Sequence, residues 1–301
     1  MTKYLGIDVG GTHIKYGVVE SGGSIKSTGR KKTRIDKEAF LNDIKSLIME
    51  VKHKIPIVGA GISFPGFIDS KRGVLVTAGA FNAFLAGFPL KEYILEEIGV
   101  PCEIENDVNS VALAEKWTGK GKNYSDFLCM TIGWGVGGAI ILNDILYRGK
   151  QFSAGEFGFM VTKGIENNIP GECGLSRNAA MSPLRFRYAQ KYGKAFEDVT
   201  GEEVFASNKP YARWLVENML ENISIGLFNL FCALNPEIIL IGGAVSKRKD
   251  IIPRLNEKLE VLFENKDIHY KIDTCYHSNN AGIIGGVYNF IRLTNENRYN
   301  A

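Results

Sequence analysis

A short apolar strand, a glycine-rich turn and a second strand follow one another twice in this chain. The first copy occupies residues 4–19, with its turn at 9–12, and the second occupies residues 127–142, with its turn at 133–138. Glycine turns of this kind join adjacent antiparallel strands. Because the same unit is repeated, the pattern predicts a duplicated domain with a cleft between the two copies.

The remaining periodicity predicts a mixed α/β chain. Apolar residues at helical spacing predict helices at about 37–53 and 208–234, and apolar runs predict buried strands at 57–63 and 238–241. The tail at 281–290 is rich in glycine and is predicted to be a helix packed through small residues. We expect a small domain at 1–117, completed by a C-terminal helix at about 285–301, and a large domain at 118–284.

Composition limits the class of protein. The chain has 301 residues, 45% of them hydrophobic, which is enough for two domains with sizeable cores. A net charge of +3 is too small to indicate a nucleic-acid or membrane partner, and the basic run at 30–34 is better interpreted as a solvated loop face. Five scattered cysteines, no apolar run of membrane-spanning length and no signal peptide predict a cytoplasmic protein.

The segment Asn106-Asp107 is the strongest candidate for catalysis. It follows an apolar strand and precedes an alanine-rich helix. An Asp at such a junction is well placed to act as a general base, because its carboxylate lies at the mouth of a cleft. Asp is also a favoured N-cap residue, and this segment alone does not separate the two interpretations.

Glycine turns that follow apolar strands indicate phosphate binding. Such turns occur at Gly10-Gly11-Thr12, at 133–138 and at Gly242-Gly243. Glycine permits positive φ and close approach of a ligand, so backbone N–H groups can contact phosphate oxygens. Asp8, beside the first turn, is either a Mg²⁺ contact, through water, or a turn-forming Asp. No Walker motif is present, and the G-x-G-x-x-G string at 133–138 is followed by a strand, which argues against P-loop and Rossmann folds.

With these motifs in place, the chain resembles the ROK family of sugar kinases and repressors, within the actin-like ATPase superfamily. The resemblance covers nearly the whole chain and rests on five motifs: Asp8-Val-Gly-Gly-Thr12, Asn106-Asp107-Val-Asn109, Gly133-Trp-Gly-Val-Gly137, Ala154-Gly-Glu-Phe-Gly158 and Gly242-Gly243. It implies two actin-like (ribonuclease H-like) domains around a central cleft and ATP-dependent phosphorylation of a sugar, usually at its C6 hydroxyl. It also implies a homodimer or tetramer, of which we expect the homodimer.

The resemblance assigns a role to each candidate residue. Asp107 is the general base toward the sugar hydroxyl, and Asn82, Asn106, Glu156 and Phe159 contact the sugar on the substrate side. The small domain supplies sugar and phosphate contacts, and the large one supplies the nucleotide side and the dimer contacts. ATP and Mg²⁺ are held by Asp8, Gly10, Gly11, Thr12, Lys15, Gly133, Gly135, Gly137, Gly242 and Gly243. Asn82 could instead be a plain turn residue, and Glu156 a solvated loop carboxylate.

One motif departs from the family pattern. Many members carry Glu-x-Gly-His and then C-x-C-G-x-x-G-C-x-E, whose His and three Cys bind zinc. Here the His position is Phe159 and the Cys positions are Gly171, Cys173 and Asn178, while the final Glu position is Ala180. One ligand of four remains, and a structural zinc site needs four, so we expect no zinc.

The same departure bears on the substrate. Phe159 and Ala180 remove polar partners near the anomeric end of the sugar, and an aromatic face there suits a second ring or aglycone. The sequence therefore favours a kinase that acts on a β-glucoside such as cellobiose. The alternative is a kinase of free hexose or N-acetylmannosamine, similar to glucokinase. A ROK repressor is disfavoured because the first strand begins at Lys3, and a non-catalytic sugar sensor because Asp107 and the glycine turns are present.

Overall fold

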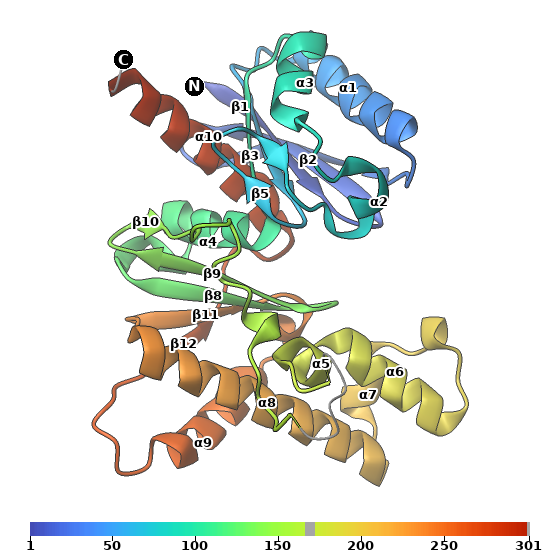
Figure 1. Cartoon of the computed structure of the whole chain (residues 1–301), viewed down its shortest axis with the longest axis vertical. Coiled ribbons are helices and arrows are strands. Elements are labelled where there is room, and N and C mark those ends of the chain that lie inside the picture. The colour runs from blue at the N-terminus through green and yellow to red at the C-terminus, as the bar shows by residue number, and fades with distance from the viewer. Residues whose placement is uncertain (166–171, 300–301) are drawn as a thin grey trace. The chain divides into compact units, whose positions relative to one another are not determined.

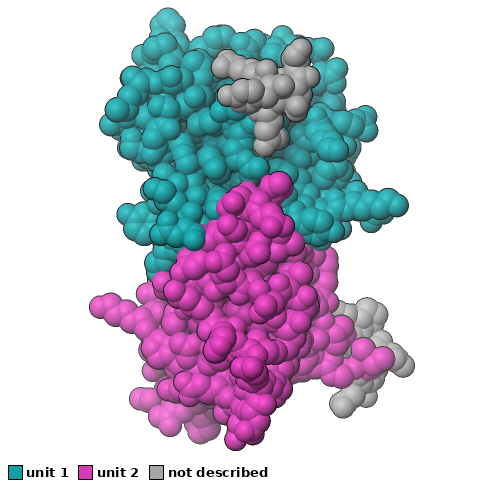
Figure 2. Space-filling model, turned by 90° about the vertical axis from the view of Figure 1, so that its left-hand side faces the viewer, with its two compact units in different colours: residues 1–123, 146–154, 276–301 teal, residues 124–145, 155–275 magenta. Residues whose placement is uncertain are grey.

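The computed structural model of the chain describes residues 1–165 and 172–299 and contains two compact units (Figure 2). Unit 1 comprises residues 1–123, 146–154 and 276–301, and unit 2 comprises 124–145 and 155–275. These bounds differ from the expected 1–117 with 285–301 and 118–284. The first unit takes up residues 146–154 because Arg148 forms an ion pair with Glu105, two residues before Asp107. It takes up the start of the C-terminal segment because the backbone N–H groups of Tyr276 and His277 donate to Glu115.

Unit 1 is built on a five-stranded sheet (Figure 1). The strand order is β3-β2-β1-β4-β7; β1, β2 and β3 are antiparallel, and β4 and β7 run parallel to β1. The strands are β1 (Lys3–Val9), β2 (His13–Glu20), β3 (Ile25–Lys32), β4 (Ala60–Phe64) and β7 (Cys102–Asn106). The helices are α1 (Lys37–Lys54), α2 (Asn82–Leu85), α3 (Leu90–Ile98), α4 (Asp107–Thr118) and α10 (Ala281–Tyr299), with a β5–β6 hairpin at Ile68–Asp69 and Val74–Leu75.

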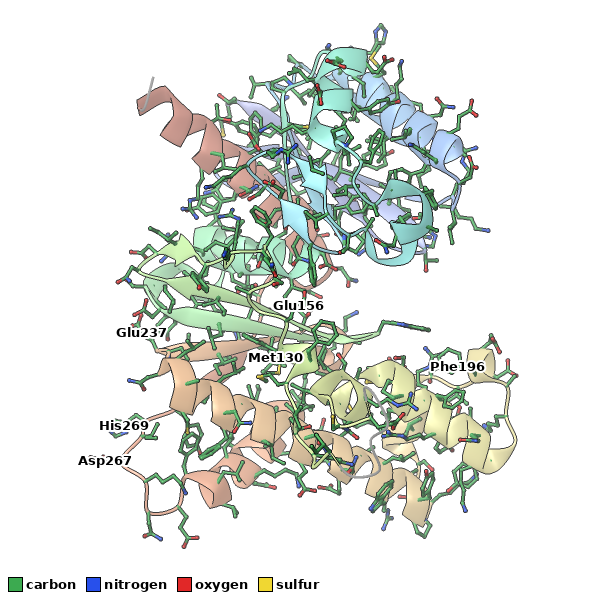
Figure 3. All side chains as sticks on the ribbon, viewed as in Figure 1. Met130, Glu156, Phe196, Glu237, Asp267 and His269 are labelled. Atoms are coloured by element: carbon green, nitrogen blue, oxygen red, sulfur yellow. The ribbon has the colours of Figure 1, made fainter. Side chains whose placement is uncertain are left out.

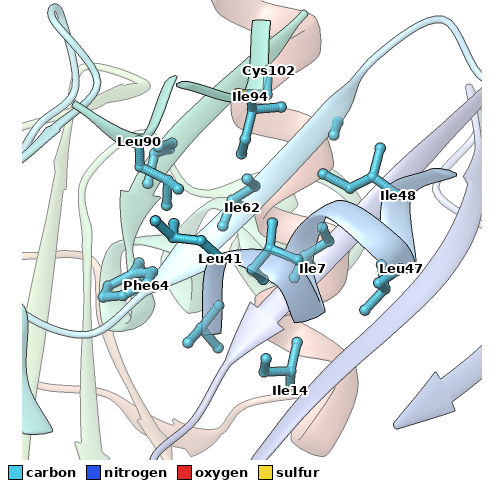
Figure 4. Packing of buried hydrophobic residues seen from close by; sticks show 14 of the residues in the cluster. Ile7, Ile14, Leu41, Leu47, Ile48, Ile62, Phe64, Leu90, Ile94 and Cys102 are labelled. Atoms are coloured by element: carbon cyan, nitrogen blue, oxygen red, sulfur yellow. The ribbon is translucent and has the colours of Figure 1, made fainter. Parts of the chain in front are cut away.

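Alternation along β1 places its residues on two faces of this sheet. Leu5, Ile7 and Val9 are buried in one hydrophobic cluster with residues of α1 and α3 (Figure 4). Gly6 and Asp8 face α10 instead. A Cβ atom on Gly6 would overlap Ile283 of α10, so glycine lets this helix approach the sheet closely. Within the helix, Gly285 packs on the Ser110 backbone and Gly286 on the Gly61 backbone, which confirms the predicted packing of the tail helix through small residues.

Unit 2 has a sheet of the same plan. Its order is β10-β9-β8-β11-β12, with β8 antiparallel to β9 and parallel to β11. The strands are β8 (Phe127–Ile132), β9 (Val136–Leu142), β10 (Ile145–Leu146), β11 (Ile238–Gly242) and β12 (Ile272–Thr274). The helices are α5 (Leu175–Ala179), α6 (Met181–Tyr192), α7 (Gly201–Ala206), α8 (Pro210–Leu234) and α9 (Ile251–Phe263). The matching strand orders confirm the predicted duplication of an α/β unit. Among the described residues, no helix combines the length and apolarity needed to cross a membrane.

Candidate active site

In unit 1 the first glycine turn is fixed from two sides. The Gly10 N–H donates to the His13 carbonyl at 3.1 Å, which closes the turn between β1 and β2. The Thr33 hydroxyl donates to the Gly10 carbonyl at 2.7 Å, and the Thr33 N–H donates to the Thr12 carbonyl at 3.0 Å. Gly11 and Thr12 remain exposed at the tip. Hydrogen bonds thus fix the turn, and the backbone at its exposed tip is accessible to a ligand.

Asp8 lies at the end of β1 with defined partners. The Ser63 hydroxyl donates to one carboxylate oxygen at 3.0 Å, and the Lys15 ammonium donates to the other at 3.4 Å. Gly282, near the start of α10, packs so closely on Asp8 that a Cβ atom there would overlap the carboxylate. Glycine at this position therefore lets the N-terminus of α10 lie against the Asp8 carboxylate.

These contacts fit a magnesium site that acts through water. Mg²⁺ in phosphate sites keeps several waters and is held by one or two carboxylates together with substrate phosphates. Asp8 supplies one carboxylate beside the exposed Gly11-Thr12 backbone. Among the described residues, no group of three or more His, Cys, Asp or Glu side chains could hold a metal ion by itself.

Asp107 is the first residue of α4, but it is not the residue that caps the helix. The side-chain oxygen of Asn106 accepts from the N–H groups of Val108 and Asn109 at 2.9 and 3.0 Å, so Asn106 is the N-cap. The Asn106 amide nitrogen donates to the Gly66 carbonyl at 3.0 Å. Asp107 accepts from Val108 N–H at 2.9 Å and is only partly buried. The capping interpretation of Asp107 is wrong because the preceding Asn already fills that role.

A buried ion pair behind Asp107 escaped the sequence analysis. Glu105 is 1% exposed, and its carboxylate accepts from Arg148 Nε at 2.7 Å, from the Asn109 amide at 2.9 Å and from the Asn106 N–H at 3.0 Å. Arg148 also donates to the side chain of Asn289 in α10 at 3.2 Å. The available signal was a Glu inside a buried strand, since a buried carboxylate requires a partner.

The fold brings most unit 1 candidates to one sheet edge. Because β1, β4 and β7 are parallel, Asp8 with its turn and Asn106-Asp107 both follow carboxyl ends of strands. The intervening strand β4 separates them by roughly 10 Å, two strand spacings. Asn82 lies elsewhere, at the start of the short helix α2, where its oxygen accepts from the Ala78 N–H at 3.1 Å. That contact gives Asn82 a turn-stabilising role and leaves its exposed amide available to a ligand.

In unit 2 the second glycine turn is held by two helix N-termini. The Met181 N–H, at the start of α6, donates to the Gly133 carbonyl at 2.9 Å, and the Ser182 hydroxyl donates to the Trp134 carbonyl at 2.5 Å. The Ser176 hydroxyl, in α5, accepts from the Val136 N–H at 2.9 Å. Gly133, Gly135 and Gly137 do not have positive φ, so the expected left-handed backbone is absent from this turn, as it is from Gly10 and Gly11.

The third turn requires glycine for its conformation. Gly243 has φ +81°, and a Cβ atom there would overlap the backbone of Ile132. The turn leads into a 3-10 helix, η6 (Ala244–Lys247), beside a cavity of about 160 Å³. Its lining includes Met181 and Arg185 of α6, and Arg248, whose guanidinium lies 4.3 Å above the Phe205 ring. The Gly243 turn therefore borders a flat, partly aromatic hollow.

Glu156 directly precedes a 3-10 helix, η3 (Phe157–Phe159), which ends at Phe159. The Glu156 carboxylate makes no hydrogen bond or ion pair with another described residue, and partial burial raises its pKa above the usual range. A half-buried carboxylate without a partner in the described part of the chain is suited to accept hydrogen bonds from ligand hydroxyls. The Phe159 side chain is 73% exposed, although it is a large apolar group.

The positions that bind zinc in many ROK members form a hydrogen-bonded loop here. The carbonyls of Cys173 and Met160 accept N–H groups of Thr162 and Leu175, which pairs the segment after η3 with the segment before α5. The Asn178 amide donates at 2.9 Å to the carbonyls of both Glu172 and Gly174. Ala180 is buried at the start of α6, and Gly171 lies outside the described residues. The Asn178 amide thus fixes the loop backbone at the position of a zinc-binding Cys in the family pattern.

Comparison with known proteins assigns the chain to a family. The ROK family profile matches residues 4–292. The chain belongs to the ROK family. It is 38% identical to the β-glucoside kinase of Listeria innocua, with 99% of both chains covered, and 35% identical to that of Klebsiella pneumoniae, with 97% of both covered. The solved Lmo2764 protein of Listeria monocytogenes has a TM-score of 0.89 and 35% identity, over 97% of this chain and 100% of that one.

These matches confirm the actin-like α/β fold and the resemblance of the chain to the ROK family. The curated ROK relatives just described are kinases that match this chain from end to end. The protein is accordingly a carbohydrate kinase.

Proposed function

We propose that this ROK kinase transfers the γ-phosphoryl group of Mg-ATP to the C6 hydroxyl of a β-glucoside such as cellobiose. The observation that carries the choice of a glucoside is the exposed Phe159 ring, at the position of the His in the sequence pattern of many ROK members. The full-length relatives from Listeria innocua and Klebsiella pneumoniae, both β-glucoside kinases, support the same choice.

Asp107 is the proposed general base. Its carboxylate takes the proton from the sugar O6, which attacks the γ-phosphorus while the bond from that phosphorus to the β–γ bridging oxygen breaks and ADP leaves. Phosphoryl transfer needs little covalent chemistry from the protein, so positioning and charge neutralisation dominate. The Asn106 cap and the Glu105–Arg148 pair support this role because they fix the helix start that carries Asp107.

The glycine turns are the proposed phosphate contacts. The exposed backbone at Gly11-Thr12 and the Lys15 ammonium belong to unit 1, and the turns at 133–137 and 242–243 belong to unit 2. Asp8 would hold Mg²⁺ through water, and the ion would neutralise phosphate charge. The small hollow beyond Gly243 is the proposed place for the nucleotide base, since Phe205 and Arg248 offer flat surfaces to a ring.

Glu156, Asn106 and the exposed amide of Asn82 are the proposed sugar contacts. Glu156 accepts hydrogen bonds from hydroxyls of the phosphorylated glucose unit, and Phe159 lies against the group attached at C1. Buried Ala180 adds no polar group there. A substituent at C1 therefore meets apolar surface, where a free anomeric hydroxyl would lose its hydrogen bonds.

The competing substrate is a free sugar. N-acetylmannosamine kinase activity has been suggested for the Lmo2764 protein, and a glucokinase of Halalkalibacterium halodurans is 30% identical over 94% of this chain. The proposal also includes a homodimer in the cytoplasm, where the five cysteines would stay reduced as the free thiols observed. Size-exclusion chromatography with light scattering tests the dimer.

A coupled ADP-release assay with cellobiose, methyl β-D-glucoside, glucose and N-acetylmannosamine tests the function. We expect kcat/KM for both glucosides to exceed that for the free sugars. Methyl 6-deoxy-β-D-glucoside, which lacks the acceptor oxygen, is the matched control and should give no ADP above background. A kcat/KM for glucose or N-acetylmannosamine far above that for every glucoside would overturn the proposal.

A further inference from the structure

A large aromatic cavity lies within unit 2 next to the Glu156 loop. Its volume is about 800 Å³. Its apolar walls come from the β8–β9 turn, from η3, from α6 and from the segment after α6, where Phe196 is labelled in Figure 3. The apolar lining residues are Trp134, Phe159, Pro183, Phe186 and Phe196. Such a lining is typical of a small-molecule pocket rather than of open protein surface.

The walls of this cavity are held in place. The Trp134 and Phe196 rings meet edge to face with centroids 5.8 Å apart, and the Arg185 guanidinium covers the Phe196 ring at 4.3 Å. Arg185 also donates to the Val199 carbonyl at 2.6 Å, which anchors the segment after α6. A guest that stacks on these rings therefore meets a preorganised surface.

The two hydroxyl side chains of the cavity lining are already bonded inside the protein, and the Arg177 guanidinium is engaged through its Nε atom. The Ser176 hydroxyl bonds the Val136 backbone, the Ser182 hydroxyl donates to the Trp134 carbonyl, and the Arg177 guanidinium donates to Glu172 at 2.7 Å. A guest rich in hydroxyls would find few partners there. Each hydrogen-bonding group left unsatisfied on burial lowers affinity roughly 5- to 150-fold.

The cavity shares Phe159 with the proposed substrate contacts, and its lining residues differ from those of the proposed nucleotide hollow. Gly158 and Phe159 line it, and Glu156 directly precedes the 3-10 helix that contains them. On α6, Phe186 lines the aromatic cavity and Met181 lines the hollow beyond Gly243, while Arg185 lines the hollow and covers the Phe196 ring. One helix thus divides two ligand surfaces of different character.

We propose that this aromatic cavity receives the aglycone of the glucoside, and that the preferred aglycone is a flat apolar ring, as in an aryl β-glucoside, rather than a second sugar. This inference rests on the proposed function, because it names the group attached at C1 of the same substrate. It predicts a specificity that the sugar contacts alone would not produce.

The first experiment compares kcat/KM for phenyl β-D-glucoside, cellobiose and methyl β-D-glucoside. We expect phenyl β-D-glucoside to exceed cellobiose by about tenfold or more, because the phenyl ring stacks on the cavity walls and has no hydroxyls to satisfy. Equal or better use of cellobiose would overturn the inference. Failure of the proposed function looks different, since none of the three glucosides would then be phosphorylated while a free sugar was.

The second experiment removes the Phe186 ring from the wall of the aromatic cavity. Phe186→Ala should lower the ratio of kcat/KM for phenyl to that for methyl β-D-glucoside about tenfold, and Phe186→Leu should lower it less. Trp214→Ala, which removes an exposed ring on α8 stacked on Tyr211 and outside the cavity lining, should leave the ratio unchanged. Thermal unfolding of each variant checks that it is folded. A rise of the KM for ATP in Phe186→Ala, with the glucoside ratio constant, would place the nucleotide in this cavity and overturn the inference.

Discussion

Arg148 and Glu105 form an ion pair at 2.7 Å directly behind the start of α4. The Glu105 carboxylate is almost fully buried, so it depends on this partner and on the N–H donors of Asn106 and Asn109. The pair ties the segment 146–154 to the strand that ends at Asn106. Together with the bond from Arg148 to Asn289, it joins this segment to the rest of unit 1.

Loss of Arg148 should therefore destabilise the protein strongly. Arg148→Met leaves a buried carboxylate without its cation, which costs about 3–5 kcal/mol in the free energy of unfolding. Urea unfolding measures the change. In the matched double variant, Glu105→Gln with Arg148→Met, the amide oxygen still accepts the two N–H bonds, so we expect less destabilisation than in the single variant. A single variant within 1 kcal/mol of the wild type would contradict the prediction.

Asp107→Asn should separate catalysis from helix stability. Removal of a general base lowers kcat by about 10²–10⁴-fold. Because Asn106 is the cap, the melting temperature should change little, whereas Asn106→Ala should lower stability by about 1 kcal/mol. Steady-state kinetics and thermal unfolding of the two variants provide the measurements. An Asp107→Asn protein with a near-normal kcat would refute the proposed mechanism.

The strands and helices were predictable where apolar periodicity is strong, as for α1, α8 and the two β-hairpins. The roles of Asn106 and Asp107 were not, because two adjacent residues that both favour N-caps differ only in backbone position once the helix has formed. The inclusion of residues 146–154 in unit 1 was also not predictable from the sequence. It depends on Arg148 meeting Glu105, 43 residues earlier in the chain, and no local pattern marks such a contact.

Glu156 should give the enzyme a pH dependence on its acidic side. Burial raises its pKa above the ordinary value, and the ionised form is the one that accepts hydrogen bonds from sugar hydroxyls. We therefore expect kcat/KM for the glucoside to rise with pH through this raised pKa. Glu156→Gln should remove that limb of the profile and lower kcat/KM at neutral pH.

Ionisation of Glu156 should affect stability in the opposite direction: it favours substrate binding but lowers the free energy of unfolding. A carboxyl whose pKa is raised on folding favours the folded state below its unfolded pKa and loses that contribution as pH rises through the folded value. Glu156→Gln should thus raise the urea midpoint at pH 7, with a difference that shrinks toward pH 4. A destabilised Glu156→Gln protein at pH 7 would indicate a structural role for the carboxylate.

Asn178 is predicted to position the sugar loop. Its amide holds the carbonyls of Glu172 and Gly174, and the latter segment pairs with the chain that follows Phe159. Asn178→Asp removes both donors at constant size. We expect a loss of about 1–3 kcal/mol in the free energy of unfolding, and a larger rise in the KM for the sugar than in the KM for ATP. Lys194→Gln, which breaks only a half-exposed ion pair with Glu203 outside the cavity lining, should cost less stability and serves as the control. Equal effects of the two variants on the sugar KM would argue against positioning by Asn178.

The last prediction compares substitutions at Gly243 and Gly133. The sequence shows both residues as a glycine in a turn that follows a strand. Gly243 has φ +81° and touches the Ile132 backbone, whereas a Cβ atom on Gly133 would meet nothing within 4 Å. Gly243→Ala combines backbone strain with overlap and should cost about 2–4 kcal/mol. Gly133→Ala should change stability by less than about 0.5 kcal/mol. Urea unfolding measures both variants, and a loss of stability for Gly243→Ala alone is the expected result. If the two variants lose stability alike, the positive φ and the close packing of Gly243 have no energetic consequence.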